Sequence, residues 1–174
     1  ASMVSGPFIA IMAKDKYNDR DTIFSKINIL APWAIGLFVC LPFLIFPEFG
    51  SVLFGDSFGN SSFEITFIFV LLYTIVLMFK QGLARVIAVY DLQWWGFFSN
   101  IIWACVLIIS IFSLNHYSAP IFALSYLIAY VINTIVIIPV YFRKDIVPRS
   151  TLSSLESLLI WVVVGVAAFI GYDM

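Results

Sequence analysis

The chain has 174 residues, of which 63% are hydrophobic and only 11% are charged. Soluble domains carry about 25% charged residues and about 45–50% apolar ones, so this composition excludes an ordinary soluble domain. The formal net charge is −1 at pH 7, and the few basic residues are spread along the chain rather than clustered, so we expect no nucleic-acid partner.

The N-terminal residues predict the end of a helix followed by a charged loop. Residues 5–12 are apolar, but a membrane span needs about 20 apolar residues, so this stretch resembles the last turns of a longer helix. Residues 14–26 mix acidic and basic side chains, which indicates a solvated cytoplasmic loop. We assign residues 1–28 to these two features. They predict a fragment of a longer membrane protein, the alternative being a complete small protein with a processed N-terminus.

Five hydrophobic runs are long enough to span a bilayer. They are residues 29–46, 63–79, 93–112, 120–142 and 155–171. Lys and Arg occur before the first run, between the second and third, and between the fourth and fifth. This alternation is the positive-inside pattern, which predicts an all-α, polytopic membrane helix bundle with a cytoplasmic N-terminal end.

The bundle is expected to divide into three further regions. Residues 29–142 would form four helices, residues 143–154 a cytoplasmic loop, and residues 155–174 an additional C-terminal transmembrane helix. Within the first region, Pro32 and Pro42 predict kinks in the first span. The glycines of residues 48–62 predict an irregular outer loop.

The second run predicts a helix that is longer than the bilayer is thick. Only the tolerated Gly82 interrupts good helix-forming sequence after the apolar part, so the helix should continue to Tyr90. From Phe63 to Tyr90 it would measure about 40 Å, against about 30 Å of hydrocarbon. Lys80 and Arg85 lie near its inner end. They are either topology determinants that reach the interface, or cations that attract phosphate at the mouth of a cavity.

Polar side chains inside the third and fourth spans are functional candidates, because polar groups are costly in a membrane. They are Asn100 in the third span, and Tyr126, Tyr130 and Asn133 on one stripe of the fourth. In one interpretation they contact sugar hydroxyls in a central, water-filled cavity. In the other they form hydrogen bonds between helices, which is a common use of such residues.

Aromatic residues at the span ends predict interfacial belts, with Trp94, Trp95 and Tyr141 on the cytoplasmic side. Ser153 and Glu156 have the spacing of a capping box, so the last helix should begin near them. The chain contains no Gly-rich phosphate loop and no metal-ligand or hydrolase motif. We therefore expect no catalytic residue, no metal and no cofactor, and neither an ATPase subunit nor a hydrolase.

Two segments are recognisable, one after the first span and the other after the short outer loop that precedes the fourth span. Residues 53–58 read Leu-Phe-Gly-Asp-Ser-Phe, and residues 123–130 read Ala-Leu-Ser-Tyr-Leu-Ile-Ala-Tyr. Over residues 14–144 the chain therefore resembles the C-terminal half of the O-antigen type of polysaccharide flippase. That family belongs to the superfamily of multidrug, oligosaccharidyl-lipid and polysaccharide exporters, whose members have twelve to fourteen helices.

The resemblance implies a function in surface polysaccharide and lipopolysaccharide biosynthesis. The intact protein would flip a polyprenyl-pyrophosphate-linked oligosaccharide across a bacterial plasma membrane. Membrane lipids and polysaccharide-assembly proteins would be its partners, and H+ or Na+ its coupling ion. Substrate contacts would come from the polar residues already singled out: Lys80, Arg85, Asn100, Tyr126, Tyr130 and Asn133.

Two other functions stay open at this point. A multidrug or cation exporter of the same superfamily would need a carboxylate near the middle of a span, and none of the five runs has one there. A non-transporting membrane subunit, or a polymerase of polysaccharide assembly, would show a large, charged outer loop. The longest outer gap, residues 47–62, is short and contains no Arg.

Overall fold

The computed structural model describes residues 23–55, 59–114, 118–143 and 155–173. The expectations for residues 1–22 and 144–154, including the capping box at Ser153, lie outside these ranges. The described residues form helices and no strand. The helices are α2 (Ile23–Ile45), α3 (Phe49–Phe54), α4 (Ser61–Val89), α5 (Gln93–Ser113), α6 (Ala119–Arg143) and α8 (Leu155–Asp173).

The described helices confirm a polytopic membrane bundle. Four of them, α2, α4, α5 and α6, are long and apolar enough to cross a membrane. α8 is also apolar, and the apolar part of it that the structure describes runs over the shorter stretch Ser157–Ala167. The boundaries agree with the predicted runs to within a few residues, except that α2 begins earlier and α4 continues beyond the apolar run to Val89, as the sequence predicts. Because length and apolar character decide membrane spans, the chain is a multi-pass membrane protein.

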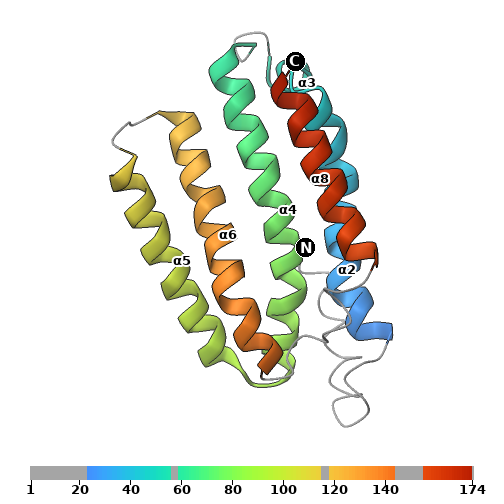
Figure 1. The fold of residues 1–174 in the computed structure, drawn as a ribbon, viewed down its shortest axis with the longest axis vertical. Helices are drawn as coiled ribbons and strands as arrows, with labels where there is room; N and C mark the ends of the chain where they lie inside the picture. The colour runs from blue at the N-terminus through green and yellow to red at the C-terminus, as the bar shows by residue number, and fades with distance from the viewer. Residues whose placement is uncertain (1–22, 56–58, 115–117, 144–154, 174) are drawn as a thin grey trace.

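The spatial order of the helices differs from their order in the sequence. α6 packs against both α4 and α5, while α2 packs on the other side of α4 and also contacts α8 (Figure 1). The row in space is therefore α5, α6, α4, α2, with α8 beside α2. α4 and α5 follow each other in the chain but have far less contact with each other than each has with α6.

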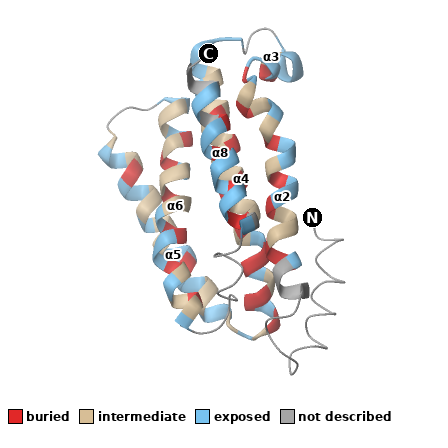
Figure 2. Cartoon of the chain, turned by 45° about the vertical axis from the view of Figure 1, so that its right-hand side comes forward, coloured by how far each residue is buried: buried red, intermediate tan, exposed pale blue. Residues whose placement is uncertain are grey.

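Burial is concentrated on α4 and on the faces of α2 and α6 that pack against it (Figure 2). Trp33 of α2 is completely buried and contacts Phe79 of α4 and Trp161 of α8, with ring centroids 5.1 Å apart in both pairs. α5 and α8 expose most of their apolar side chains. In a bilayer such exposed apolar faces are compatible with lipid, so they do not need a protein cover.

α4 has the extra length that the sequence predicts. Its 29 residues correspond to about 43 Å of helix, so it must tilt or project beyond the hydrocarbon. At its start, the Asn60 side-chain oxygen accepts a hydrogen bond from the backbone N–H of Phe63 at 2.9 Å. At its end, Asp91 has a φ of 56° and the N–H of Leu92 donates to the carbonyl of Ile87 at 3.0 Å. This left-handed residue closes the helix and starts the short turn into α5.

Replacing the capping Asn60 by alanine should lower the free energy of unfolding by about 1 kcal/mol, because one N–H at the helix start loses its acceptor. Denaturant unfolding of the protein in detergent, followed by circular dichroism, measures this. Ser61→Ala is the matched control, since it shortens a neighbouring polar side chain that forms no cap. Equal losses for both variants would contradict the capping role.

The outer loop is more regular than the sequence predicts. The expectation of an irregular segment over residues 48–62 is wrong for α3, which forms a short helix. Gly50 does not break this helix. It is buried, and a Cβ atom there would lie 2.7 Å from a ring carbon of Phe63. The glycine is therefore needed for close packing of the Phe63 ring against α3, rather than for a turn.

The aromatic belt is only partly as predicted. Trp94 is 72% exposed at the start of α5, which suits an interfacial position. Tyr141 is only 3% exposed, so its side chain faces the bundle rather than the lipid, and its interfacial position stays a prediction. Its ring is buried in the bundle because the row α5, α6, α4 covers that face of α6 from both sides.

Candidate functional site

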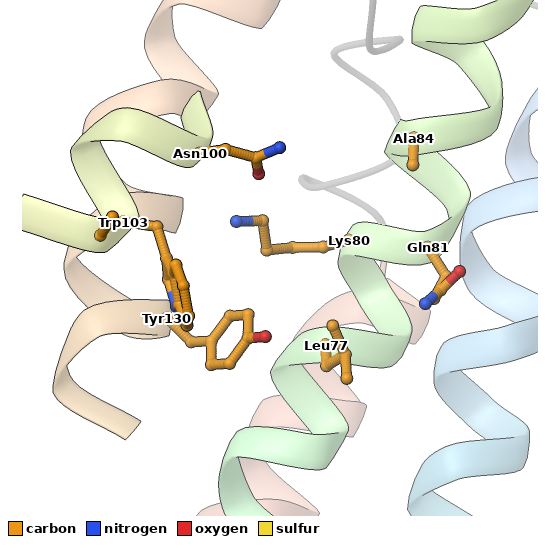
Figure 3. A pocket seen from close by; sticks show the side chains of 8 residues that line it. Leu77, Lys80, Gln81, Ala84, Asn100, Trp103 and Tyr130 are labelled. Atoms are coloured by element: carbon orange, nitrogen blue, oxygen red, sulfur yellow. The ribbon is translucent and has the colours of Figure 1, made fainter. Parts of the chain in front are cut away.

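The candidate site is a pocket of about 500 Å³ between α4, α5 and α6 (Figure 3). Its α4 side includes Leu77, Lys80 and Ala84, which recur at helical spacing. Asn100 on α5 is exposed, so the pocket opens on the surface of the bundle. The complete lining is Leu77, Lys80, Gln81, Ala84, Asn100, Trp103, Ala104 and Tyr130.

A smaller pocket of about 150 Å³ adjoins the first. Lys80, Ala84 and Asn100 line both pockets, so Lys80 lies at their junction. The smaller pocket extends toward the C-terminal end of α4, where Ile87 lies, and toward the start of α5. Its other lining residues are Leu83, Ile87, Gly96, Ser99 and Tyr141.

Lys80 carries the charge of the site. Its Nζ donates a hydrogen bond to Oδ1 of Asn133 and lies 5.4 Å from the centroid of the Tyr130 ring. That distance is within cation–π range, which is about 6 Å. Figure 3 shows its side chain directed toward Asn100 and Tyr130. No carboxylate among the described residues pairs with it.

Asn133 joins three helices. It is completely buried in α6, accepts hydrogen bonds from Lys80 on α4 and from the Ser99 hydroxyl on α5, and donates Nδ2 to the Ser99 carbonyl at 2.7 Å. Of the two interpretations of Asn133, the structure therefore supports hydrogen bonding between helices. With no exposed surface, Asn133 is not placed to touch a sugar.

Tyr126 and Tyr130 belong to an aromatic cluster beside the pocket. Tyr73 on α4 stacks on Tyr130 with centroids 5.8 Å apart, and Trp103 on α5 lies 5.4 Å from Tyr130 and 5.9 Å from Tyr126. Trp103 Nε1 is buried without a hydrogen-bond partner. Tyr73 and Trp103 were not among the residues predicted from the sequence. Each has a spacing signal, since Tyr73 lies two helical turns before Lys80 and Trp103 one turn after Asn100.

Arg85 is separated from the other candidates. Its Nη2 donates to the backbone carbonyl of Asn28 on α2 at 3.2 Å, and Asn28 donates its side-chain Nδ2 to the carbonyl of Gly82 at 2.9 Å. Arg85 lines neither of the two pockets. The structure thus places it at the α2–α4 contact rather than beside Lys80, and its contact with phosphate stays a prediction.

The site combines one cation, exposed amide groups and flat aromatic surfaces. Such a set binds an anionic group through the ammonium and a ring through the aromatic faces. Among the described residues, no cluster of His, Cys, Asp or Glu could hold a metal ion.

Comparison of the chain with protein-family models, with curated protein sequences and with solved structures returns no match.

Proposed function

We propose that the chain is part of a transporter that flips a polyprenyl-pyrophosphate-linked oligosaccharide from the cytoplasmic to the outer leaflet of a bacterial plasma membrane. The observation that carries this proposal is the ammonium of Lys80. It lies in an open pocket inside a membrane bundle, and its contacts are a neutral amide oxygen and an aromatic face rather than a carboxylate.

A cation in this position favours an anionic ligand. Charged groups inside a membrane are costly and are usually paired, so an incoming phosphate gains from an ammonium whose charge is not already neutralised. Asn100 supplies an exposed amide beside it, and Trp103 and Tyr130 supply ring surfaces for a sugar. A pyrophosphate–sugar head group cannot cross hydrocarbon unaided, whereas its lipid chain can remain in the bilayer beside the open pocket.

The multidrug exporter gains no support from the described residues. Among the described helices, Glu64 lies in the first turn of α4, and Glu156 and Asp173 lie at the two ends of α8. Asp91 lies in the turn between α4 and α5. None of these carboxylates is near the middle of a span, where proton or cation coupling would require one. A pocket whose charge is a single lysine also repels cationic drugs.

The proposal is tested by replacing Lys80 in the full-length protein and measuring translocation of a fluorescent polyprenyl-pyrophosphate oligosaccharide in proteoliposomes. Lys80→Met should slow translocation at least about tenfold, because a hydrogen bond to a charged group is worth about 1.5–3 kcal/mol. Lys80→Arg should retain most of the rate, since it keeps the charge.

The matched control is Arg143→Gln. Arg143 is an exposed cation in the last turn of α6 and lines neither pocket. Its replacement removes the same charge from the bundle and should leave the rate within about twofold. If Lys80→Met translocates at the wild-type rate, or if Lys80→Met and Arg143→Gln lose equal shares of the translocation rate, the pocket has no role in translocation.

A further inference from the structure

We propose that Asn133 is a positioning residue that holds the Lys80 ammonium at the pocket while leaving its charge available, and that this neutrality makes the site selective for anions. The inference rests on the proposed function and deepens it. It assigns the selectivity to a residue that does not touch the ligand, because Asn133 is completely buried.

The orientation of the Asn133 amide is determined from α5. Its Nδ2 donates to the backbone carbonyl of Ser99 at 2.7 Å, which turns Oδ1 toward Lys80. The Ser99 hydroxyl also donates to Oδ1 at 3.3 Å. A reversed amide would bring its NH2 group against the ammonium and lose the bond to Ser99. Two contacts from Ser99 on α5 therefore hold the Asn133 amide so that its Oδ1 accepts the hydrogen bond from Lys80.

The remaining donors of Lys80 face the pocket. An ammonium group has three N–H donors, and the contacts made by Lys80 within the described residues are one bond to Asn133 and the face of Tyr130. Asn133 fixes the position of Nζ at the junction of the two pockets without supplying a negative charge. A carboxylate in the same position would form an ion pair with Lys80 and repel an incoming phosphate.

The replacement Asn133→Asp keeps the size of the side chain, adds a negative charge beside Lys80 and removes the donor to the Ser99 carbonyl. We use inorganic pyrophosphate as the probe and titrate it calorimetrically into the full-length protein in detergent. Asn133→Asp should weaken binding at least about tenfold, because the new carboxylate neutralises the Lys80 ammonium. Its melting temperature should fall only slightly, because the ion pair with Lys80 offsets the lost bond to Ser99.

The same replacement in a Lys80→Met background should cause a much larger fall in melting temperature. The bond to Ser99 is lost in both backgrounds, but here the introduced carboxylate also has no cation beside it. A purely structural role for Asn133 would give equal falls in both backgrounds. Thr134→Val is the control, since within the described residues the Thr134 hydroxyl bonds the Tyr130 carbonyl of its own helix and its loss should leave pyrophosphate binding unchanged.

The experiment distinguishes failure of the proposed function from failure of the positioning role of Asn133. If the unaltered protein binds no pyrophosphate, the anion selectivity and the proposed function are both overturned. If it binds pyrophosphate but Asn133→Asp binds it equally well, or if the fall in melting temperature is the same in both backgrounds, the positioning role alone is overturned. Weakened binding together with the larger fall in the Lys80→Met background supports it.

Discussion

Replacing Gly82 by leucine should force α2 and α4 apart and lower the free energy of unfolding by about 3 kcal/mol, the upper range for overpacking. A Cβ atom at Gly82 would lie 2.7 Å from both the carbonyl oxygen of Asn28 and the Cα of Ile29. These are backbone atoms, so no side chain can rotate out of the way. The hydrogen bond from Asn28 to the Gly82 carbonyl would break as the helices separate.

Gly165→Leu in α8 is the matched control. It makes the same replacement inside an apolar helix, but nothing lies within 4 Å of a Cβ atom at that position. Both variants gain the same intrinsic helix propensity, so their difference isolates the close approach. Unfolding in detergent, followed by circular dichroism, gives the two free energies. If Gly82→Leu lowers the free energy of unfolding no more than Gly165→Leu does, α2 and α4 have room to separate.

Replacing Trp33 by alanine should detach α8 from the bundle. The Trp33 ring is completely buried and contacts both Phe79 and Trp161. In a bilayer, lipid is as apolar as the protein interior, so helix association depends on close packing. Removing the ring leaves a cavity at this contact, with an expected loss of about 2 kcal/mol, below the range for soluble cores because the transfer term is small.

Hydrogen exchange measured peptide by peptide reports the detachment. Exchange should rise in α8 and in the facing part of α2, and stay unchanged where α4 packs on α6. Trp94→Ala is the control, because it removes the same ring from a side chain that is 72% exposed. Unchanged exchange in α8 after Trp33→Ala would mean that other contacts hold this helix.

Hydropathy predicted the spans because a membrane leaves few alternatives. Backbone polar groups in hydrocarbon must be paired within a helix, so the long apolar runs had to become helices. The continuation of α4 past Phe79 was also predictable, since no residue there stops a helix. The short helix α3 was missed because Gly50 has two opposite uses, breaking a helix or admitting a neighbouring ring, and local sequence does not distinguish them.

The site was only partly predictable because it depends on which helices are neighbours. Lys80 and Asn133 are 53 residues apart in the chain, and helical periodicity does not reveal that α6 lies between α4 and α5. The same limit applies to Arg85. Because Arg85 is close to Lys80 in the sequence of α4, both cations were expected at the mouth of one cavity. Arg85 instead lies on a different face of α4, directed toward α2. The sequence did not indicate Ser99, because one of its two contacts with Asn133 is made by its backbone carbonyl, a group that every residue has.

The position of α6 between α4 and α5 has a consequence for how the protein is made. A ribosome delivers α4 and α5 to the membrane before α6, because synthesis starts at the N-terminus. Until α6 arrives, Lys80 lacks both Asn133 and Tyr130, its contacts in the finished bundle. The intermediate that lacks α6 therefore exposes a lysine to lipid. Nascent chains arrested before residue 119 should be retained by insertion chaperones or degraded by membrane proteases, and those extended past residue 143 should be released.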